Sequence, residues 1–273
     1  MSRAHHGRIS HLAQFFTNRQ DCRILRRDAY KVLLRAHDQG PQGQDYFVKI
    51  YRHPHLFHSR VIDWKLVGGG QEYRMCKKLR SLGIATPEPV GFATDRNWAG
   101  YPRQSLYASI WLQDSHTLDA ILRGQHARAR IDASGWQQFI GALGRFVGRL
   151  HLKLVNAKDL NTKNILVMWP PGDKPRFFLV DYERTVILRK YDLARFMNAL
   201  SQIGAGLIPV FEGDIEQLCK GYASVVDHID ARDLTRQVRA ASREKSCLWQ
   251  QEIDGLFDAI GQRMHDRGDS KAP

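Results

Sequence analysis

The stretch Asp159-Leu-Asn-Thr-Lys-Asn164 is followed, after an apolar segment and a turn, by Phe177-Phe-Leu-Val-Asp181-Tyr-Glu183. Asp159 therefore lies five residues before Asn164 on a polar loop, and Asp181 follows directly after a second apolar segment. Phosphoryl transfer needs a carboxylate that orients the attacking hydroxyl, and an amide and a carboxylate that hold magnesium on the phosphates. Asp159, Asn164 and Asp181 are our candidates for these three roles.

Two upstream residues extend this pattern. Lys49 lies inside the apolar strand Tyr46–Tyr51, where its ammonium group needs an anion or a path to solvent. Glu72, on the next expected helix, is the obvious partner, and such a pair positions the phosphates of a nucleotide. Taken alone, Lys49 is more often a lysine on an edge strand that faces water. The joint order of the five residue types nevertheless predicts a kinase active site.

The loop residues also have structural interpretations. Asp159 could be a turn residue that bonds nearby backbone N–H groups, and Asn164 could cap a helix or strand. Asp181 ends a buried strand, where a charge without a cation is costly, and magnesium is the natural counter-ion. Asn161 and Lys163 are expected to assist in the loop, with Lys163 either near the γ-phosphate or solvated.

Composition limits the class of protein. The 273 residues are 43% hydrophobic and 25% charged, as in a folded globular protein. No apolar run approaches 18 residues, so no membrane span is expected, and the polar N-terminus has no secretory h-region. The four cysteines lie far apart, which favours reduced thiols in the cytoplasm. The formal net charge of +13 favours nucleic acid, an acidic membrane surface or a phosphorylated or carboxylated substrate as partner.

The pattern of elements predicts an α+β, bilobal, protein-kinase-like fold. We expect a flexible leader (residues 1–20), a small, mainly β N-lobe with one helix (21–113) and a mainly helical C-lobe (114–273). The expected strands are two within Cys22–Ala36 that meet near Arg27-Asp28, then Tyr46–Tyr51, Ser105–Leu112, Ile165–Trp169 and Arg176–Val180. The expected helices are Gln71–Leu82, Leu118–Leu122, Ser134–Leu152, Tyr191–Ile203, Phe211–Asp227, Ala231–Lys245 and Leu248–Arg267.

Three segments carry a family resemblance: Gly83-Ile-Ala-Thr-Pro-Glu-Pro-Val-Gly91, Asp159-Leu-Asn-Thr-Lys-Asn164-Ile-Leu and Val180-Asp181-Tyr-Glu-Arg184. Together they resemble the bacterial lipopolysaccharide core kinases, the heptose kinase and Kdo kinase family, over roughly residues 22–205. Members lack a G-x-G-x-x-G phosphate loop, and residues 25–35 of this chain contain no glycine.

The resemblance implies ATP and Mg²⁺ as cofactors and a heptose or Kdo hydroxyl of the lipopolysaccharide inner core as acceptor. Such an anionic glycolipid fits the positive charge and implies peripheral contact with the cytoplasmic face of the inner membrane, while nucleic acid is not expected. The oligomeric state is left open. The implied site residues are Asp159 and Lys163 for catalysis, Lys49, Glu72 and Asn161 for the cofactor, and Asn164, Asp181 and Glu183 for the metal.

The chain also departs from the family pattern. Ala157 stands where the family usually has a histidine two residues before the catalytic aspartate, which affects rate more than fold. Asp181-Tyr182-Glu183 replaces D-F-G, so a glycine-dependent activation flip is not expected, and Glu183 adds a carboxylate near the metal. A catalytically weak pseudokinase is therefore an alternative.

Other functions fit parts of the sequence. An aminoglycoside-like phosphotransferase would share the fold, although the sites of such enzymes are usually acidic and this chain is basic. A non-enzymatic module on a degenerate kinase scaffold would bind nucleic acid or membrane through its basic surface. A protein kinase would need an activation segment ending in A-P-E, which is not recognisable. The segment His53–His58 matches no standard zinc spacing and is interpreted as a connector.

Overall fold

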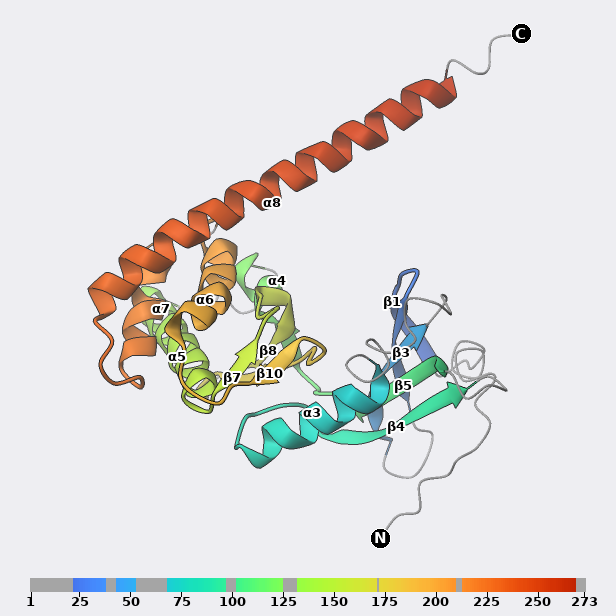
Figure 1. The fold of residues 1–273 in the computed structure, drawn as a ribbon, viewed down its shortest axis with the longest axis horizontal. Helices are drawn as coiled ribbons and strands as arrows, with labels where there is room; N and C mark the ends of the chain where they lie inside the picture. Colours follow the sequence, from blue (N-terminus) through green and yellow to red (C-terminus); the bar gives the residue numbers. More distant parts are fainter. Residues whose placement is uncertain are drawn as a thin grey trace. The chain divides into compact units, whose positions relative to one another are not determined.

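The computed structural model describes residues 22–37, 43–52, 68–96, 102–124, 132–170, 172–209 and 213–268 (Figure 1). The strands are β1 (Cys22–Arg27), β2 (Lys31–His37), β3 (Asp45–Arg52), β4 (Pro89–Arg96), β5 (Pro102–Ile110), β6 (Ser115–Thr117), β7 (Val155–Ala157), β8 (Ile165–Met168), β9 (Arg176–Leu179) and β10 (Thr185–Ile187). The helices are α3 (Gly69–Ser81), α4 (Leu118–Leu122), α5 (Ala133–Leu152), α6 (Leu193–Leu207), α7 (Asp214–Ala223) and α8 (Ala231–Gly268), with a 3-10 turn at Thr162–Asn164. The expected leader and the segment His53–His58 lie outside these residues.

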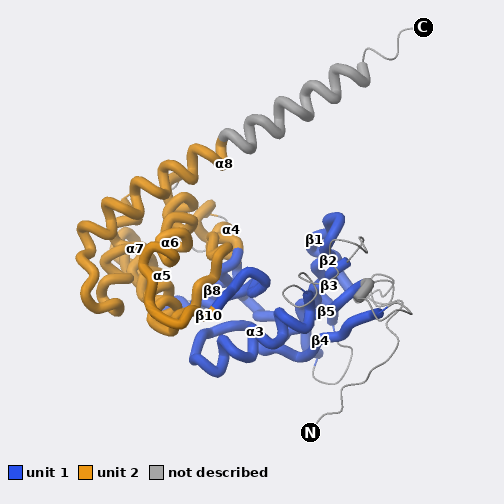
Figure 2. Tube along the Cα trace, viewed as in Figure 1, with its two compact units in different colours: residues 1–116, 164–186 blue, residues 117–163, 187–273 orange. Residues whose placement is uncertain are grey.

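The chain forms two compact units, which Figure 2 shows in different colours. The first comprises residues up to His116 together with Asn164–Val186, and the second comprises Thr117–Lys163 and the rest of the chain from Ile187. The candidate residues Lys49, Glu72, Asn164, Asp181 and Glu183 all belong to the first unit. The lobe boundary expected between residues 113 and 114 stays a prediction.

The first unit is built on a five-stranded antiparallel sheet with the order β1-β2-β3-β5-β4. Alternate residues of β2 are buried, as expected for a strand with one face on a core. The core under this sheet consists of Val32, Leu34, Ala36, Val48, Ile50 and Leu106. Lys49 pairs with Leu33 of β2 and Tyr107 of β5, so it lies in the middle of the sheet. The alternative interpretation of Lys49 as an edge-strand lysine facing water is therefore wrong.

Helix α3 is fixed to the sheet at its first turn. A Cβ at Gly69 would collide with the backbone of Leu106, so only glycine allows this close approach between α3 and β5. The Ser105 hydroxyl accepts a hydrogen bond from Gly69 N at 3.1 Å, which satisfies one of the free N–H groups at the helix start. At the other end, Gly83 takes a positive φ of 74°, a common way for a helix to stop.

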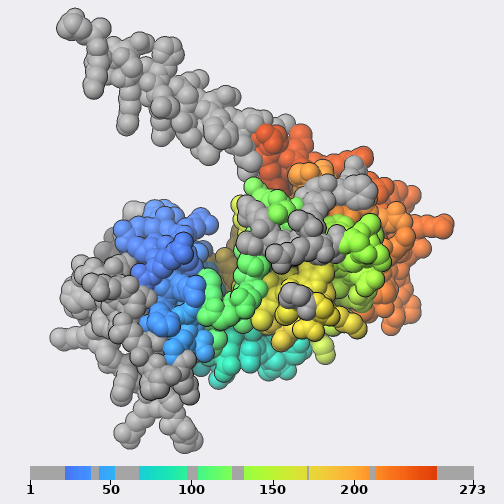
Figure 3. All heavy atoms as spheres, turned by 180° about the vertical axis from the view of Figure 1, so that it is seen from behind, coloured from blue at the N-terminus to red at the C-terminus, as the bar shows by residue number. Residues whose placement is uncertain are grey.

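The second unit is helical. Helices α5 and α7 pack along each other, and their atoms lie side by side on the face that Figure 3 shows. A Cβ at Gly144 of α5 or at Gly221 of α7 would collide with the backbone of the facing helix, so these glycines permit the close packing. Helix α8 packs on α6 and α7.

Two expected helices are a single helix in the structure. The sequence predicted separate helices at Ala231–Lys245 and Leu248–Arg267, whereas α8 runs without a break over 38 residues. The junction Ser246-Cys247 contains neither glycine nor proline, so no residue there ends the helix. None of the described helices combines the length and apolar character needed to cross a bilayer. Strands β6, β7 and β10 were not expected, because three residues are too few for a recognisable period.

His151, near the end of α5, is part of the core of the second unit. Its ring stacks on Phe196 with centroids 3.9 Å apart, and its Nδ1 lies 3.0 Å from the Tyr222 hydroxyl. The Tyr222 hydroxyl in turn lies 2.8 Å from that of Tyr191. Burial lowers the pKa of His151 from 6.5 to about 3, so the ring is neutral at physiological pH.

This histidine should make stability depend on pH. Because its pKa falls on folding, the unfolded chain binds the proton first, and stability is lost as the pH falls from about 6.5 towards 3. Between pH 7 and pH 5.5 we expect the wild type to lose about 1 kcal/mol more unfolding free energy than His151→Gln. Urea unfolding at the two pH values measures this difference. Equal losses in the two proteins would show that the pKa of His151 does not fall on folding.

Candidate functional site

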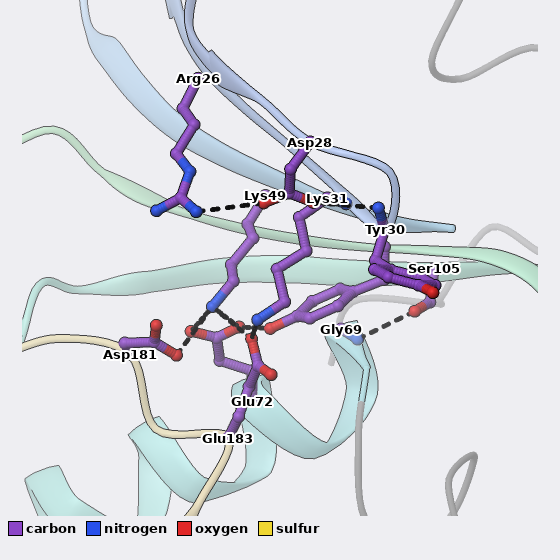
Figure 4. Close-up of polar contacts among 11 residues, drawn as sticks. Arg26, Asp28, Tyr30, Lys31, Lys49, Gly69, Glu72, Ser105, Asp181 and Glu183 are labelled. Atoms are coloured by element: carbon purple, nitrogen blue, oxygen red, sulfur yellow. Dashed lines mark hydrogen bonds and ion pairs between the residues drawn. The ribbon is translucent and has the colours of Figure 1, made fainter. Parts of the chain in front are cut away.

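The ammonium group of Lys49 is the centre of a cluster of carboxylates (Figure 4). Its Nζ lies 2.9 Å from Asp181 Oδ1, 2.7 Å from Glu183 Oε1 and 3.3 Å from Glu72 Oε2. The Lys49 side chain is only 4% exposed, so these ion pairs are shielded from water on the lysine side. The structure thus brings together four of the predicted residues, from β3, from α3 and from the loop after β9.

Glu72 is held by more than the lysine. It lies in the first turn of α3, which Gly69 and Ser105 fix against β5. The Tyr51 hydroxyl donates a hydrogen bond to Glu72 Oε2. Burial raises the pKa of Glu72, and Lys49 opposes this effect without cancelling it. The sequence did not single out Tyr51, although it lies two residues from Lys49 and therefore on the same side of β3.

The turn Asp181-Tyr182-Glu183 brings two carboxylates to one lysine. Asp181 has a positive φ of 62°, a conformation that aspartate tolerates better than most residues. Tyr182 is 2% exposed and meets the ring of Tyr107 edge-on at 6.4 Å. Because the tyrosine is anchored in the core, the acids on either side of it both reach Lys49.

The charges in this cluster do not cancel. Two lysines take part, because the Lys31 Nζ lies 2.6 Å from the same Glu183 Oε1 that contacts Lys49. Burial alone would lower the pKa of Lys49, but the three carboxylates raise it well above its usual value. Burial would raise the pKa of Glu183, and the lysines lower it instead. Among the described residues of this cluster, two ammonium groups face three carboxylates, and this surplus of negative charge favours a further cation.

The residues predicted to bind magnesium fit that ion. Asn164 and the strand end before Asp181 are neighbours, because Val180 N donates a hydrogen bond to Asn164 O at 3.0 Å. An amide and a carboxylate oxygen are ligands that Mg²⁺ accepts, with phosphates and water completing the shell. Within the described ranges, no three His, Cys, Asp or Glu side chains form a self-contained metal cage. The metal roles of Asn164, Asp181 and Glu183 stay predictions.

The other three predicted residues lie on one loop of the second unit. Asp159 is partly buried, and its carbonyl accepts a hydrogen bond from Asn161 N at 2.9 Å. Asn161 Oδ1 accepts a bond from Lys163 N at 3.0 Å, so this asparagine closes a local turn, while Lys163 is exposed. Their roles at the nucleotide stay predictions. Ala157, where the family has histidine, is buried in β7 just before the loop.

One face of α6 holds this loop. The side chains of Asn198 and Gln202 both donate hydrogen bonds to the carbonyl of Lys158, at 3.0 and 2.9 Å. One turn further on, a Cβ at Gly206 would lie 2.5 Å from Thr162 Cγ2. These three helix residues are four apart and so share one face. They were not predicted: Asn198 and Gln202 lay in the expected helix Tyr191–Ile203, but Gly206 lies beyond it.

Comparisons with known proteins match most of the chain. Residues 23–222 match the family described as "Lipopolysaccharide kinase (Kdo/WaaP) family". A solved structure entitled "WaaP in complex with acyl carrier protein" has a TM-score of 0.61 at 19% identity, covering 85% of this chain and 90% of that one. The likeness confirms the expected bilobal, protein-kinase-like α+β fold.

Two curated proteins named 3-deoxy-D-manno-octulosonic acid kinase are also similar. The protein of Pasteurella multocida (strain Pm70) is 26% identical over 113 residues, which are 41% of this chain and 43% of that protein. The protein of Vibrio cholerae serotype O1 (strain ATCC 39315 / El Tor Inaba N16961) is 22% identical over 161 residues, 54% of this chain and 63% of that protein. The alignments thus span less than two thirds of either relative.

Removal of the central cation should destabilise the first unit in a pH-dependent way. Lys49→Met leaves Glu72 buried without its positive partner, which we expect to lower the unfolding free energy by about 3 kcal/mol at pH 8. Because the pKa of Glu72 is already raised, the variant's Glu72 should take up a proton as the pH falls, and the deficit should shrink at pH 5. Denaturant unfolding at both pH values measures the effect.

Lys78→Met is the matched control, because Lys78 is an exposed lysine on α3. It should change stability by less than about 0.5 kcal/mol. A Lys49→Met protein as stable as the control at pH 8 would mean that the ion-pair cluster does not form.

Proposed function

Because the chain belongs to the lipopolysaccharide kinase (Kdo/WaaP) family, we propose that it phosphorylates a sugar hydroxyl, of heptose or Kdo, in the lipopolysaccharide inner core. ATP is the phosphoryl donor, as the family's kinase fold implies. The observation that carries the proposal is the buried Lys49 ammonium, held between Glu72 of α3 and Asp181 after β9. This arrangement positions nucleotide phosphates beside a carboxylate that can hold a metal ion.

The proposed reaction exchanges one bond for another at phosphorus. The acceptor hydroxyl oxygen forms a bond to the γ-phosphorus, and the bond between that phosphorus and the β-γ bridging oxygen breaks, so ADP leaves. Asp159 orients the hydroxyl and accepts its proton. Lys49 contacts the α- and β-phosphates, and Glu72 fixes the lysine. Asn161 and Lys163 support the loop, with Lys163 near the γ-phosphate.

Magnesium is the cation proposed for the surplus negative charge. Asn164 and Asp181 would hold it, with Glu183 as a third candidate. When bound, the ion neutralises charge on the phosphates. The side-chain chemistry supports this assignment, since amide and carboxylate oxygens suit Mg²⁺.

The acceptor is anionic and carried by a membrane lipid, and β1 offers a surface that suits it. This edge strand exposes Arg23, Arg26 and Arg27. Between the arginines, Ile24 and Leu25 are 44% and 42% exposed. Basic side chains with interleaved apolar ones favour the headgroup region of an anionic bilayer. We therefore propose that β1 contacts the membrane peripherally, on its cytoplasmic face, while the acceptor is phosphorylated.

Loss of Asp159 should abolish most of the transfer. In an assay with labelled ATP, Mg²⁺ and core lipopolysaccharide in anionic vesicles, Asp159→Ala should reduce the rate about 10²-fold or more, as expected for a positioned catalytic group. The ATP affinity should change little. Asp173→Ala is the matched control, because Asp173 is exposed in the turn between β8 and β9.

Three further results would each contradict part of the proposal. Wild-type protein that binds ATP but transfers no phosphate to the core would favour another acceptor or a pseudokinase. Equal transfer by wild type and Asp159→Ala would remove Asp159 from the reaction. If the de-acylated core is phosphorylated as efficiently as the vesicle-bound one, and salt has no effect on either, membrane contact plays no part.

The tight contact between α6 and the loop should also affect rate. Gly206→Ala forces a methyl group against Thr162 and displaces the Asp159 loop, which we expect to lower kcat about 10-fold with little change in the KM for ATP. The double variant Gly206→Ala with Thr162→Ser removes the opposing Cγ2 and should recover most of kcat. The serine retains the hydroxyl that bonds Asp119 at 3.2 Å.

Thr162→Ser alone is the control and should resemble the wild type. A Gly206→Ala defect that the second substitution does not relieve would show that the loop is not positioned through this contact.

A further inference from the structure

In the turn between β1 and β2, an aspartate side chain binds backbone N–H groups of the same turn. In glycine-rich phosphate loops, backbone N–H groups face the phosphates. In this chain Asp28 Oδ1 accepts hydrogen bonds from Tyr30 N at 2.9 Å and from Lys31 N at 2.7 Å. A carboxylate of the protein itself therefore occupies the two N–H groups at the start of β2. The phosphates of a nucleotide need other partners on this side of the site.

Lys31 supplies a side chain in place of those N–H groups. Its Nζ lies 2.6 Å from Glu183 Oε1, and the Lys49 Nζ lies 2.7 Å from the same oxygen. The two ammonium groups are therefore at most 5.3 Å apart. Figure 4 shows both lysine side chains reaching down from the sheet, and Glu183 is the carboxylate that they share. Two ammonium groups at this separation can bind different oxygens of one phosphate chain.

The two lysines differ in their access to solvent. The Lys49 side chain is 4% exposed, whereas that of Lys31 is 32% exposed. Lys31 is therefore the more accessible of the two lysines to a ligand from solvent. Glu183 is 11% exposed, and its oxygen occupies the position between two cations where an anion is most stabilised.

We infer that Lys31 is a second phosphate-binding residue, and that Glu183 occupies the phosphate position until a nucleotide displaces it. The proposed role of Glu183 at the metal then applies only to the state in which the nucleotide has released it from the lysines. The inference rests on the proposed function, because it concerns the nucleotide of the same site. The ligand class is the phosphate chain of a nucleoside diphosphate or triphosphate. Displacement forms and breaks only ion pairs: the phosphate oxygens replace Glu183 Oε1 on the two ammonium groups.

Equilibrium binding of ADP and of adenosine, in the presence of EDTA, tests the inference without a metal. Lys31→Met should weaken ADP binding about 10-fold, as expected when a hydrogen bond to a charged group is lost. Its affinity for adenosine should be unchanged, because adenosine has no phosphate. Glu183→Gln should bind ADP more tightly than the wild type, since it lacks the competing negative charge. Lys31→Arg should retain most of the ADP affinity, and Lys78→Met is the control on α3.

The outcomes separate this inference from the proposed function. Equal ADP affinity in Lys31→Met and wild type would overturn the role of Lys31, while wild-type ADP binding and phosphate transfer would leave the proposed function intact. ADP binding weakened equally in Glu183→Gln and Lys31→Met would show a structural ion pair and overturn the displacement. Wild-type protein that binds neither ADP nor adenosine would overturn both proposals. Thermal unfolding of each variant confirms that it is folded.

Discussion

One buried positive charge organises the first unit. Lys49 lies in the central strand of the sheet, where its ammonium group cannot reach bulk water. Carboxylates from other elements must therefore neutralise its charge. This requirement explains why α3 approaches β5 closely enough to need Gly69, and why the chain turns sharply at Asp181. The same ion pairs thus join the elements that carry the residues proposed to bind the nucleotide and the metal.

In the second unit, helix contacts hold a polar loop in one conformation. Hydrogen bonds from α6 to a loop carbonyl and the contact at Gly206 limit the movement of residues 158–162. Helix α8 supports α6 in turn, since Lys245 Nζ donates a bond to Asn198 Oδ1 at 2.8 Å. The loop is therefore fixed by helices that contribute no candidate catalytic residue themselves.

Residue order along the chain predicted most of the fold and the ion pair between Lys49 and Glu72. Strand and helix periods depend on local sequence, and a lysine in an apolar strand requires an acid that a later element can supply. The contact of Glu183 with two lysines could not be predicted in this way, because it depends on the backbone turn at Asp181 and on the burial of Tyr182. The length of α8 was missed since the expected break rested on no glycine or proline. The hydrogen bond from Asn198 of α6 to the carbonyl of Lys158 joins residues about 40 positions apart, and no local sequence pattern predicts such a contact.

The burial of Tyr182 limits how this site can be controlled. Protein kinases change between active and inactive states when the aromatic residue beside the metal-binding aspartate moves. In this chain that residue is buried against Tyr107 of β5, and exposing a fully buried aromatic side chain costs about 3 kcal/mol. At about 1.4 kcal/mol per factor of ten, fewer than about one molecule in a hundred would have the tyrosine out at any moment. For the proposed kinase activity, this packing therefore disfavours control by movement of the tyrosine.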